Sequence, residues 1–450
     1  PGTGKTHVIN QYTAWLQAAG IPTAVTASTG IAATHIGGFT IHSWSAVGTR
    51  DRLSNYDLDV ILGKEYVVKR LKKAAVLIID EISMLDGNIL NMVDRILQSA
   101  RGNARPFGGV QIVLVGDFFQ LPPVTRNNEP VNYAFASNAW QEAQPTVCYL
   151  TDQYRHEDEL LSGLLSSVRK NTIDESHYTL LEEQQEIGYG DIEPTRLFTH
   201  NMAVDELNLT EIRKLSSTPK QYQMKSTGNK ILVESLIRSC LSPQTLLLAE
   251  EAMVMCTKNN FEAGYANGTL GRVVGFDASS KFPIIRTTDE KEIVVKPATW
   301  SIQDNGKILA EIEQIPLRLA WAITVHKSQG MSLDAVEIDL SRAFAYGQGY
   351  VALSRVRTLL GLKVLGLNPN ALQVDPKIVK SDEKFRQDAD TIDKELEKLS
   401  ADDLLKQQKE FVKLTGKRWP SKENLQNKKY KKPKSTYEET KDLLEAGNTL

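Results

Sequence analysis

A glycine-rich segment that passes directly into a helical pattern constrains the fold of this sequence most. Residues 1–6 read PGTGKT, which matches the last six positions of the phosphate-binding motif G-x-x-x-x-G-K-[ST]. The first glycine of the motif would fall two residues before Pro1, so we expect the loop, and the sheet behind it, to be incomplete in this chain. Backbone N–H groups of such a loop, and of the helix that follows, bind phosphate oxygens. The segment predicts an ATP site made by Gly2, Thr3, Gly4, Lys5 and Thr6.

The residue types within that site predict a different role for each residue. The Lys5 ammonium is expected to pair with the β- and γ-phosphates, and the Thr6 hydroxyl to ligate Mg²⁺. An apolar run at 75–79 ends in Asp80 and Glu81, the usual partner of such a loop. Asp80 is expected to hold Mg²⁺ through its water shell, and Glu81 to orient or deprotonate the attacking water. The alternative is a pair of solvated carboxylates at a strand end, and the phosphate loop favours the catalytic interpretation over it.

The composition is that of a soluble globular protein. The chain has 450 residues, 41% hydrophobic and 24% charged, and a formal net charge of −2. That length corresponds to about three domains, and no apolar stretch approaches the roughly 18–20 residues that span a bilayer. We therefore expect no membrane partner.

Cysteine usage bears on the compartment. Cys148, Cys240 and Cys256 form no C-x-x-C pair and no metal-ligand spacing. An odd and sparse set indicates unpaired thiols in an intracellular, reducing compartment, and plain buried hydrophobic side chains are the simplest interpretation.

A basic run lies near the C-terminus. Residues 413–434 contain nine lysines and arginines against one acid, Glu423, a local charge of +8. Such a run is either a tail that contacts phosphates or a solvated, disordered segment, and the sequence does not decide between them.

Residues 1–150 alternate strand and helix patterns. A helical pattern runs from Thr6 to Ala19, and apolar strands are predicted at 22–26, 75–79 and 110–115. Continuous apolar strands separated by helices indicate a parallel sheet covered on both faces, with ligands at the carboxyl ends of its strands. Residues 45–73 are polar and predict a small helical insertion.

A second α/β unit is predicted at 151–374. Strands are expected at 195–199, 335–340 and 362–367. Short alternating strands and glycine turns at about 251–315 predict an inserted small β-barrel. Residues 375–450 are charge-dense, helical in pattern at 388–414 and then lysine-rich, which predicts a partly helical or disordered tail. The fold class is therefore α/β with two parallel-sheet domains, two insertions and a charged tail.

Further polar residues follow predicted strands or turns. Gln120, in the segment GDFFQLPPV, could sense the γ-phosphate or the attacking water. Phe118 and Phe119 in the same segment either stack on nucleic-acid bases or belong to the core, and the composition favours neither. Arg155 and Arg355 could reach the γ-phosphate across a domain boundary, although a single arginine is by default a surface residue.

Segment 29–44 combines small residues, hydroxyls, a Gly-Gly pair and spaced aromatic residues after a strand. Glycines permit close approach of backbone, and threonine and serine donate to phosphates, so the segment suits a nucleic-acid contact. Tight packing between a helix and a loop is the alternative.

These strings resemble the petite-integration-frequency (PIF) family of helicases, in superfamily 1, subgroup B, with RecD-like relatives. The resemblance spans roughly residues 1–370, and the strings occur in the order that the family has. They are TGIAATHIGGFTIHSW, LIIDEISMLDG, RPFGGVQ, GDFFQLPPV, LTDQYR, LAWAITVHKSQGMSLD and GQGYVALSRVRTLLGL.

The resemblance implies an ATP-driven motor that moves 5′ to 3′ on single-stranded DNA and unwinds forked or structured DNA, as a monomer, in replication, repair or telomere maintenance. It implies two RecA-like domains, a wedge at 45–73 and a Src-homology-3-like barrel at 251–315. The glutamine motif that usually recognises adenine is absent, and the tail after Asp375 has no assigned equivalent. The implied ATP-site residues are Gly2, Thr3, Gly4, Lys5, Thr6, Asp80, Glu81, Gln120, Tyr154, Arg155 and Arg355. The implied DNA-side or coupling residues are Thr29, Gly38, His42, Phe119, Thr199, Asn201, His326 and Lys327.

Two other functions fit parts of the sequence. A phosphate loop with Asp80 and Glu81 alone would also suit an ATPase that remodels proteins or a nucleotide switch. An incomplete loop would suit a DNA-binding fragment without catalysis. The strings HKSQG and ALSR in the second α/β unit favour the motor.

Overall fold

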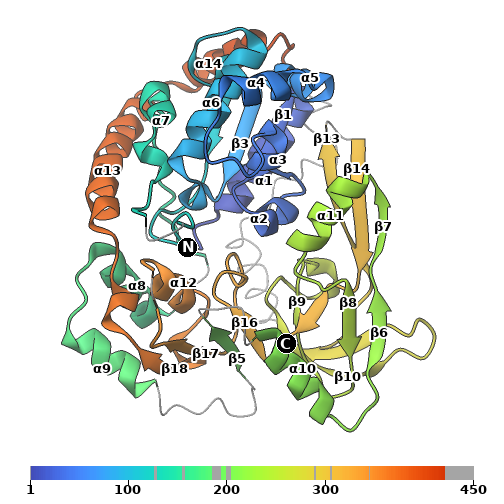
Figure 1. The fold of residues 1–450 in the computed structure, drawn as a ribbon. Helices are drawn as coiled ribbons and strands as arrows, with labels where there is room; N and C mark the ends of the chain where they lie inside the picture. The colour runs from blue at the N-terminus through green and yellow to red at the C-terminus, as the bar shows by residue number, and fades with distance from the viewer. Residues whose placement is uncertain are drawn as a thin grey trace, which may run out of the picture.

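The computed structural model describes residues 2–125, 129–154, 158–184, 194–198, 204–287, 290–304, 307–343 and 345–420. Two parallel sheets lie one above the other in Figure 1, each with its own helices. No helix in these ranges combines the length and the apolarity that a membrane crossing requires.

The first domain is built on a parallel sheet with strand order β2-β1-β3-β4. The apolar run at 75–79 forms β3, whose five residues are all buried because β1 and β4 flank it. The strand register pairs Ala27 with Asp80, so both strands end at the same edge of the sheet. The elements of this domain are α1 (Lys5–Ala18), β1 (Thr23–Ala27), α2 (Gly30–His35), β2 (Phe39–Thr40), α3 (Ile41–Ser45), β3 (Val76–Asp80), α6 (Gly87–Arg101), β4 (Gln111–Leu114) and α7 (Asn138–Ala143).

The insertion predicted at 45–73 is helical, as expected. It contains α4 (Asn55–Leu62) and α5 (Glu65–Lys73). A capping box starts α4: the Ser54 hydroxyl accepts from the Asp57 N–H while the Asp57 carboxylate accepts from the Ser54 N–H, which satisfies two helix-end donors.

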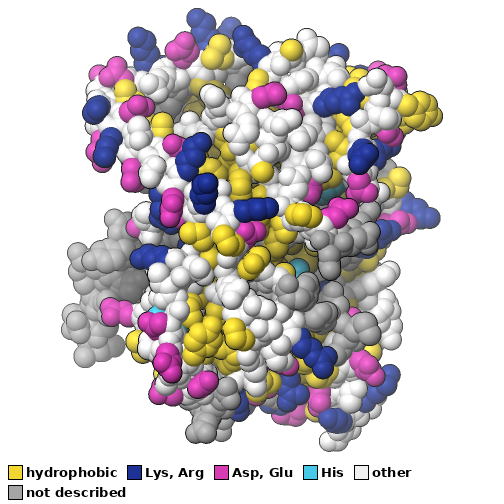
Figure 2. Space-filling view, turned by 60° about the vertical axis from the view of Figure 1, so that its left-hand side comes forward, with side chains coloured by type: hydrophobic (Ala, Val, Ile, Leu, Met, Phe, Trp, Pro, Cys, Tyr) yellow, Lys and Arg dark blue, Asp and Glu magenta, His cyan; other side chains and the backbone are white. Residues whose placement is uncertain are grey.

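The outer edge of β4 pairs with no strand among the described residues. A cavity of about 1480 Å³ lies beside this edge, lined by α1, β4, the segment at 143–151 and the C-terminal helices. Figure 2 shows hydrophobic side chains gathered midway down one face of the molecule, between its upper and lower halves.

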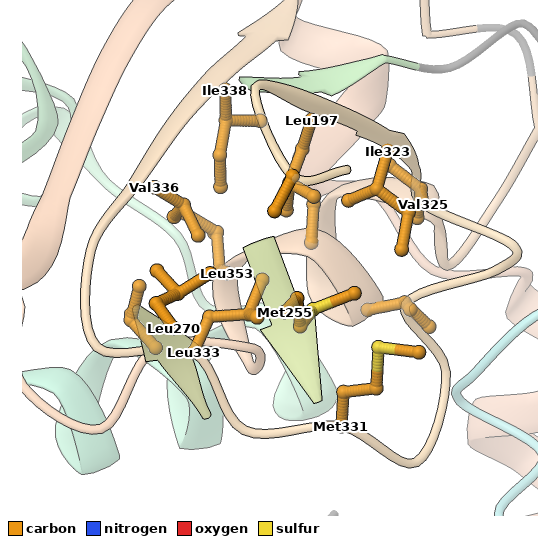
Figure 3. Packing of buried hydrophobic residues seen from close by; sticks show 14 of the residues in the cluster. Leu197, Met255, Leu270, Ile323, Val325, Met331, Leu333, Val336, Ile338 and Leu353 are labelled. Atoms are coloured by element: carbon orange, nitrogen blue, oxygen red, sulfur yellow. The ribbon is translucent and has the colours of Figure 1, made fainter. Parts of the chain in front are cut away.

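The second domain is built on another parallel sheet, with strand order β16-β5-β17-β18. Its core mixes residues of this sheet, such as Leu197 and Ile338, with Met255 and Leu270 from the inserted strands (Figure 3). The elements are α8 (Glu159–Lys170), α9 (Glu175–Glu183), β5 (Thr195–Phe198), α10 (Val204–Lys214), β16 (Ala322–Thr324), β17 (Val336–Leu340), α12 (Gln348–Leu353) and β18 (Leu362–Leu367).

The strands predicted at 251–315 are present, but the described residues do not close them into a barrel. They divide between a five-stranded antiparallel sheet, β12-β11-β10-β9-β15, and a three-stranded one, β13-β14-β7, while β6 pairs with β8. The second of these sheets, with α11, packs on the first domain: Trp300 and Leu236 belong to the hydrophobic cluster of that domain. The elements are β6 (Lys220–Gln223), β7 (Lys225–Gly228), α11 (Lys230–Ser239), β8 (Thr245–Leu248), β9 (Met253–Cys256), β10 (Leu270–Phe276), β11 (Pro283–Thr287), β12 (Glu292–Val294), β13 (Ala298–Asp304), β14 (Lys307–Gln314) and β15 (Leu317–Leu319).

The start of the predicted tail is a packed helix pair, α13 (Pro376–Leu396) and α14 (Ala401–Leu414). It runs back along the outside of the first domain (Figure 1). Phe385 of α13 lies 5.9 Å, centroid to centroid, from both Phe135 and Trp140. Val412 of α14 is fully buried in a cluster with residues of α1 and β3. Phe385 and Val412 therefore tie the helix pair to the first domain, while Ile378 near the start of α13 belongs to the core cluster of the second. Residues 421–450 lie outside the described ranges.

Candidate nucleotide site between the two parallel sheets

The phosphate loop begins α1 in the geometry that the motif predicts. Gly4 is the helix N-cap with φ 80° and ψ 16°, a left-handed conformation that favours glycine. No side chain accepts a hydrogen bond from the first turn of α1, so its N–H groups are available to an anion such as a phosphate. The Tyr154 N–H donates to the Gly2 carbonyl at 2.9 Å, and the Tyr154 ring lies over Gly4, with the side chain 66% exposed. Tyr154 is thus placed beside the loop, as the resemblance implies.

Two carboxylates lie at the end of β3. The Asp80 Oδ1 accepts the Glu81 N–H at 2.8 Å. Burial raises the pKa of Asp80, while this N–H and the Lys5 ammonium oppose the rise. Burial, together with repulsion from Asp80, raises the pKa of Glu81 to about 7, against the opposing charges of Lys5 and Arg355. Glu81 therefore changes protonation near neutral pH, which suits a general base.

A Mg²⁺ ion fits the donor set at this end of the loop. Magnesium usually takes one or two protein oxygens and completes its shell with water and phosphate oxygens. Thr6 on the first turn of α1 and Asp80 at the end of β3 offer one hydroxyl and one carboxylate. The described residues contain no group of three or more histidine, cysteine, aspartate or glutamate side chains that could hold a metal ion by themselves.

The loop after β4 reaches into the second domain. Phe119 and Leu121 belong to the hydrophobic core of that domain although they follow a strand of the first sheet. Between them, the Gln120 side chain is buried and donates to Asp117 Oδ2 at 3.3 Å. Gln120 is therefore held where the two domains meet.

An ion pair between a half-buried arginine and a buried carboxylate anchors the same loop. Arg169 of α8 donates through Nη1 to both oxygens of Asp117, at 2.9 and 3.0 Å, and to the Tyr350 hydroxyl at 3.0 Å. Its guanidinium lies 4.2 Å from the centroid of the Phe119 ring. Burial would raise the pKa of Asp117, but Arg169 and Lys5 outweigh it and hold that pKa well below its usual range. Asp117 is therefore a fixed negative charge.

Two groups of the second domain face Glu81. The Gln329 amide donates to Glu81 Oε2 at 2.9 Å and, at a longer 3.4 Å, to Gln120 Oε1. Arg355, only 1% exposed, lies close enough to lower the pKa of Glu81. Its guanidinium donates to the carbonyls of Val351 and Ser328, at 2.7 and 3.2 Å.

The expected DNA-side residues divide into several groups. Thr29 caps α2 by accepting the Ala32 N–H, and Gly38 is required by packing because a Cβ there would lie 2.2 Å from the Val25 carbonyl oxygen. These contacts favour the tight-packing interpretation of segment 29–44. Burial lowers the pKa of His42. Phe119 is 3% exposed and covered by Arg169, so its ring presents no open face to a base here.

His326 and Lys327 lie half-buried in the turn after β16. Burial lowers the pKa of Lys327, and the nearby positive charge of Arg318 lowers it further. Arg155, Thr199 and Asn201 lie outside the described residues.

The sequence did not point to Gln329, Arg169 or Arg318 individually. Gln329 stands inside the HKSQG string, from which only the histidine and the lysine were assigned, because basic groups suit phosphates. Arg169 lies in an ordinary amphipathic helix and carries no local signal. Arg318 is buried on β15 next to leucines, a charged residue inside an apolar strand, and that pattern is the one signal that could have found it.

The three cysteines are free, as expected, and burial raises the pKa of Cys256 to about 12.

Comparisons with known proteins agree with this geometry. Residues 1–192 match the PIF1-like helicase family. The chain is 39% identical to the ATP-dependent DNA helicase Pif1 of Psychrobacter sp. (strain PRwf-1), over 86% of this chain and 67% of that protein. It is 36% identical to human ATP-dependent DNA helicase PIF1, over 84% of this chain; it spans 59% of that protein's length.

Solved structures give the same result. The crystal structure of Bacteroides sp Pif1 in complex with ADP-AlF4 matches with a TM-score of 0.75 and 30% identity, over 86% of this chain and 91% of that one. Bacteroides Pif1 in complex with ADP-AlF3 and ssDNA matches with a TM-score of 0.56 and 30% identity, over 85% and 91% of the two chains.

Proposed function

The chain belongs to the PIF1-like helicase family, and from that premise we propose that it hydrolyses ATP to move 5′ to 3′ along single-stranded DNA and to unwind duplex ahead of it. One observation carries the proposal. Glu81 and Gln120 of the first domain meet Gln329 and Arg355 of the second where the two domains touch. A site divided in this way ties the chemistry to the relative position of the domains.

The division assigns a role to each side. The phosphate loop and α1 bind the phosphates, with Lys5 neutralising the β- and γ-phosphate charge. Glu81 accepts a proton from the attacking water, which Gln120 orients. Thr6 and Asp80 would hold a Mg²⁺ ion, which would supply positive charge against the phosphate oxygens. Arg355, with Arg155 as the second candidate, stabilises the charge that develops on the γ-phosphate.

The DNA side follows from the same arrangement. His326 and Lys327 directly precede Ser328 and Gln329 in one turn. Ser328 contacts Arg355, and Gln329 contacts Glu81. A phosphate contact at Lys327 would therefore act on the hydrolytic groups through a few residues. The crystal structures of Bacteroides Pif1 with ssDNA support single-stranded DNA as the partner, and that of two Pif1 helicases at forked dsDNA supports forked DNA.

The test combines ATP hydrolysis with unwinding. We expect single-stranded DNA to stimulate ATP turnover by the wild-type protein, and Lys5→Ala to abolish that turnover because the γ-phosphate loses its counter-charge. Lys214→Ala, on the exposed face of α10, is the matched control and should change neither. Forked substrates with a 5′ tail should be unwound, and those with a 3′ tail should not. DNA-stimulated turnover that survives in Lys5→Ala, or unwinding from 3′ tails only, would overturn the proposal.

A further inference from the structure

The turn at residues 324–330 is fixed at both ends by the core of the second domain. Val325, the second residue of the turn, and Met331 directly after it are fully buried and point into the hydrophobic cluster (Figure 3). Within the turn, the Ser328 N–H donates to the Thr324 carbonyl at 2.9 Å, and the Ser328 hydroxyl donates to the Val325 carbonyl at 2.8 Å. The turn therefore moves with the second domain and has little freedom of its own.

From this turn one side chain crosses to the first domain. Gln329 is 9% exposed, and its Nε2 donates to Glu81 Oε2 at 2.9 Å and to Gln120 Oε1 at 3.4 Å. Both acceptors follow strands of the first sheet. One amide group thus bonds to the two side chains that would contact the attacking water.

We propose that Gln329 is a positioning residue for ATP hydrolysis, which orients the Glu81 carboxylate and the Gln120 amide toward the water only while the second domain lies against the first. The inference rests on the proposed function and deepens its site. The last torsion of a glutamate side chain is broad, so a carboxylate without a fixed donor samples many orientations. A charge-assisted N–H···O bond to one oxygen holds the plane of the carboxylate and directs the other oxygen.

The neighbouring residue strengthens the argument. The Ser328 carbonyl accepts from Arg355 Nη1 at 3.2 Å. Two consecutive residues of one turn therefore contact the expected general base and the expected γ-phosphate arginine. A shift of this turn would displace the Gln329 amide and the Arg355 guanidinium together. The position of the second domain would in this way control the orientation of the groups that hydrolyse ATP.

Two substitutions separate positioning from packing. Gln329→Met keeps the length and volume of the side chain and removes the donor. We expect it to lower the DNA-stimulated kcat roughly tenfold or more, with KM for ATP and the affinity for single-stranded DNA within about twofold. Gln329→Glu keeps the shape but places a second carboxylate against Glu81, so its kcat should fall below that of Gln329→Met. If only the size and polarity of the side chain mattered, Gln329→Glu would have the higher kcat of the two variants.

The matched control is Gln314→Met. Gln314 is also buried, and its amide donates to the backbone carbonyls of Tyr222, Pro243 and Gln244, away from the site. It should lower the melting temperature at least as much as Gln329→Met and leave kcat unchanged.

A mutant cycle gives the second readout. Because Gln329 and Gln120 act on the same water, the double variant Gln329→Met/Gln120→Met should be little worse than the poorer single variant. Additive losses, an unchanged kcat in Gln329→Met, or a loss confined to KM would overturn the inference while leaving ATP hydrolysis by the wild type intact. A wild type that does not hydrolyse ATP on single-stranded DNA would remove the proposed function, and the inference with it.

Discussion

Within the described ranges the two parallel sheets have four strands each, yet the loops at the domain boundary carry opposite chemistry. The first sheet supplies carboxylates there, Asp80, Glu81 and Asp117. The second domain supplies N–H donors there from Gln329 and Arg169, and the positive charge of Arg355. Acceptors on one side and donors on the other make the boundary attractive when the domains meet. Under the proposed function, neither domain alone would hold all the groups that hydrolysis needs.

The largest expected effect comes from the acidic side. Glu81→Gln preserves shape and removes the proton acceptor, so we expect ATP turnover to fall on the order of 10²–10⁴-fold, with binding of single-stranded DNA retained. The measurement is steady-state phosphate release with DNA in excess. Asp94→Asn is the control, since Asp94 is a buried acid of the same domain that hydrogen-bonds Gln98, away from the boundary. Equal losses in the two variants would contradict a division of labour by domain.

The next effect concerns the ion pair that crosses the boundary. Asp117→Asn leaves the Arg169 guanidinium without its counter-charge, and we expect a loss of about 2–3 kcal/mol in the free energy of unfolding, because Arg169 keeps some contact with solvent. Urea denaturation measures it. Glu337→Gln breaks the more exposed pair with Arg196 and should cost less than about 1 kcal/mol. If both variants lose the same amount, the boundary pair contributes no more than a surface pair.

A smaller effect should show that the C-terminal helix α14 stabilises the first domain and not the second. Val412→Ala removes two buried methyl groups from the contact of α14 with the first domain, so we expect a loss of about 1–2 kcal/mol in the stability of that domain. Hydrogen exchange in β3 should report the loss, and exchange in β17 should not change. Leu414→Ala, at an exposed position of the same helix, should stay within about 0.5 kcal/mol. If Val412→Ala increased hydrogen exchange equally in β3 and β17, the helix pair would not stabilise the first domain specifically.

The smallest effect is a dependence on pH. Since burial and Asp80 raise the pKa of Glu81 to about 7, the carboxylate that accepts a proton is the minor form below that pH and the major form above it. ATP turnover should therefore rise by about tenfold at most between pH 6 and 8. A turnover that falls over this range would show that a protonated group limits the reaction.

Much of the first domain could be predicted from the sequence because its signals are local. The apolar run ending in Asp80 and Glu81, and the glycines before Lys5, specify a strand end and a helix start within a few residues. The barrel prediction failed in its closure, because strand pairing over long separations, such as β7 with β14, leaves no mark in a short window. The helical character of the tail was predicted, but its packing was not, because a charged composition conceals the few apolar residues that pack, among them Phe385 and Val412.

The same limit applies to the site. The phosphate loop and the acids are recognisable by type and spacing. Gln329 and Arg169 acquire their roles only from a neighbour more than fifty residues away in sequence, through contacts with Glu81 and Asp117. Residues of this kind are found from the fold.

The path of the C-terminal helix pair has a mechanical consequence. The chain leaves the first domain near residue 150 and returns to it at α13, where the Tyr133 hydroxyl donates to Asp375 at 3.0 Å. If each domain moves as a unit, two covalent connections define a line, and rotation about that line would be favoured over swivelling about a single linker or sliding apart. The packing of the β13-β14-β7 sheet on the first domain would have to yield in that rotation. Energy released at the boundary would thus be directed into one opening angle rather than spread over many.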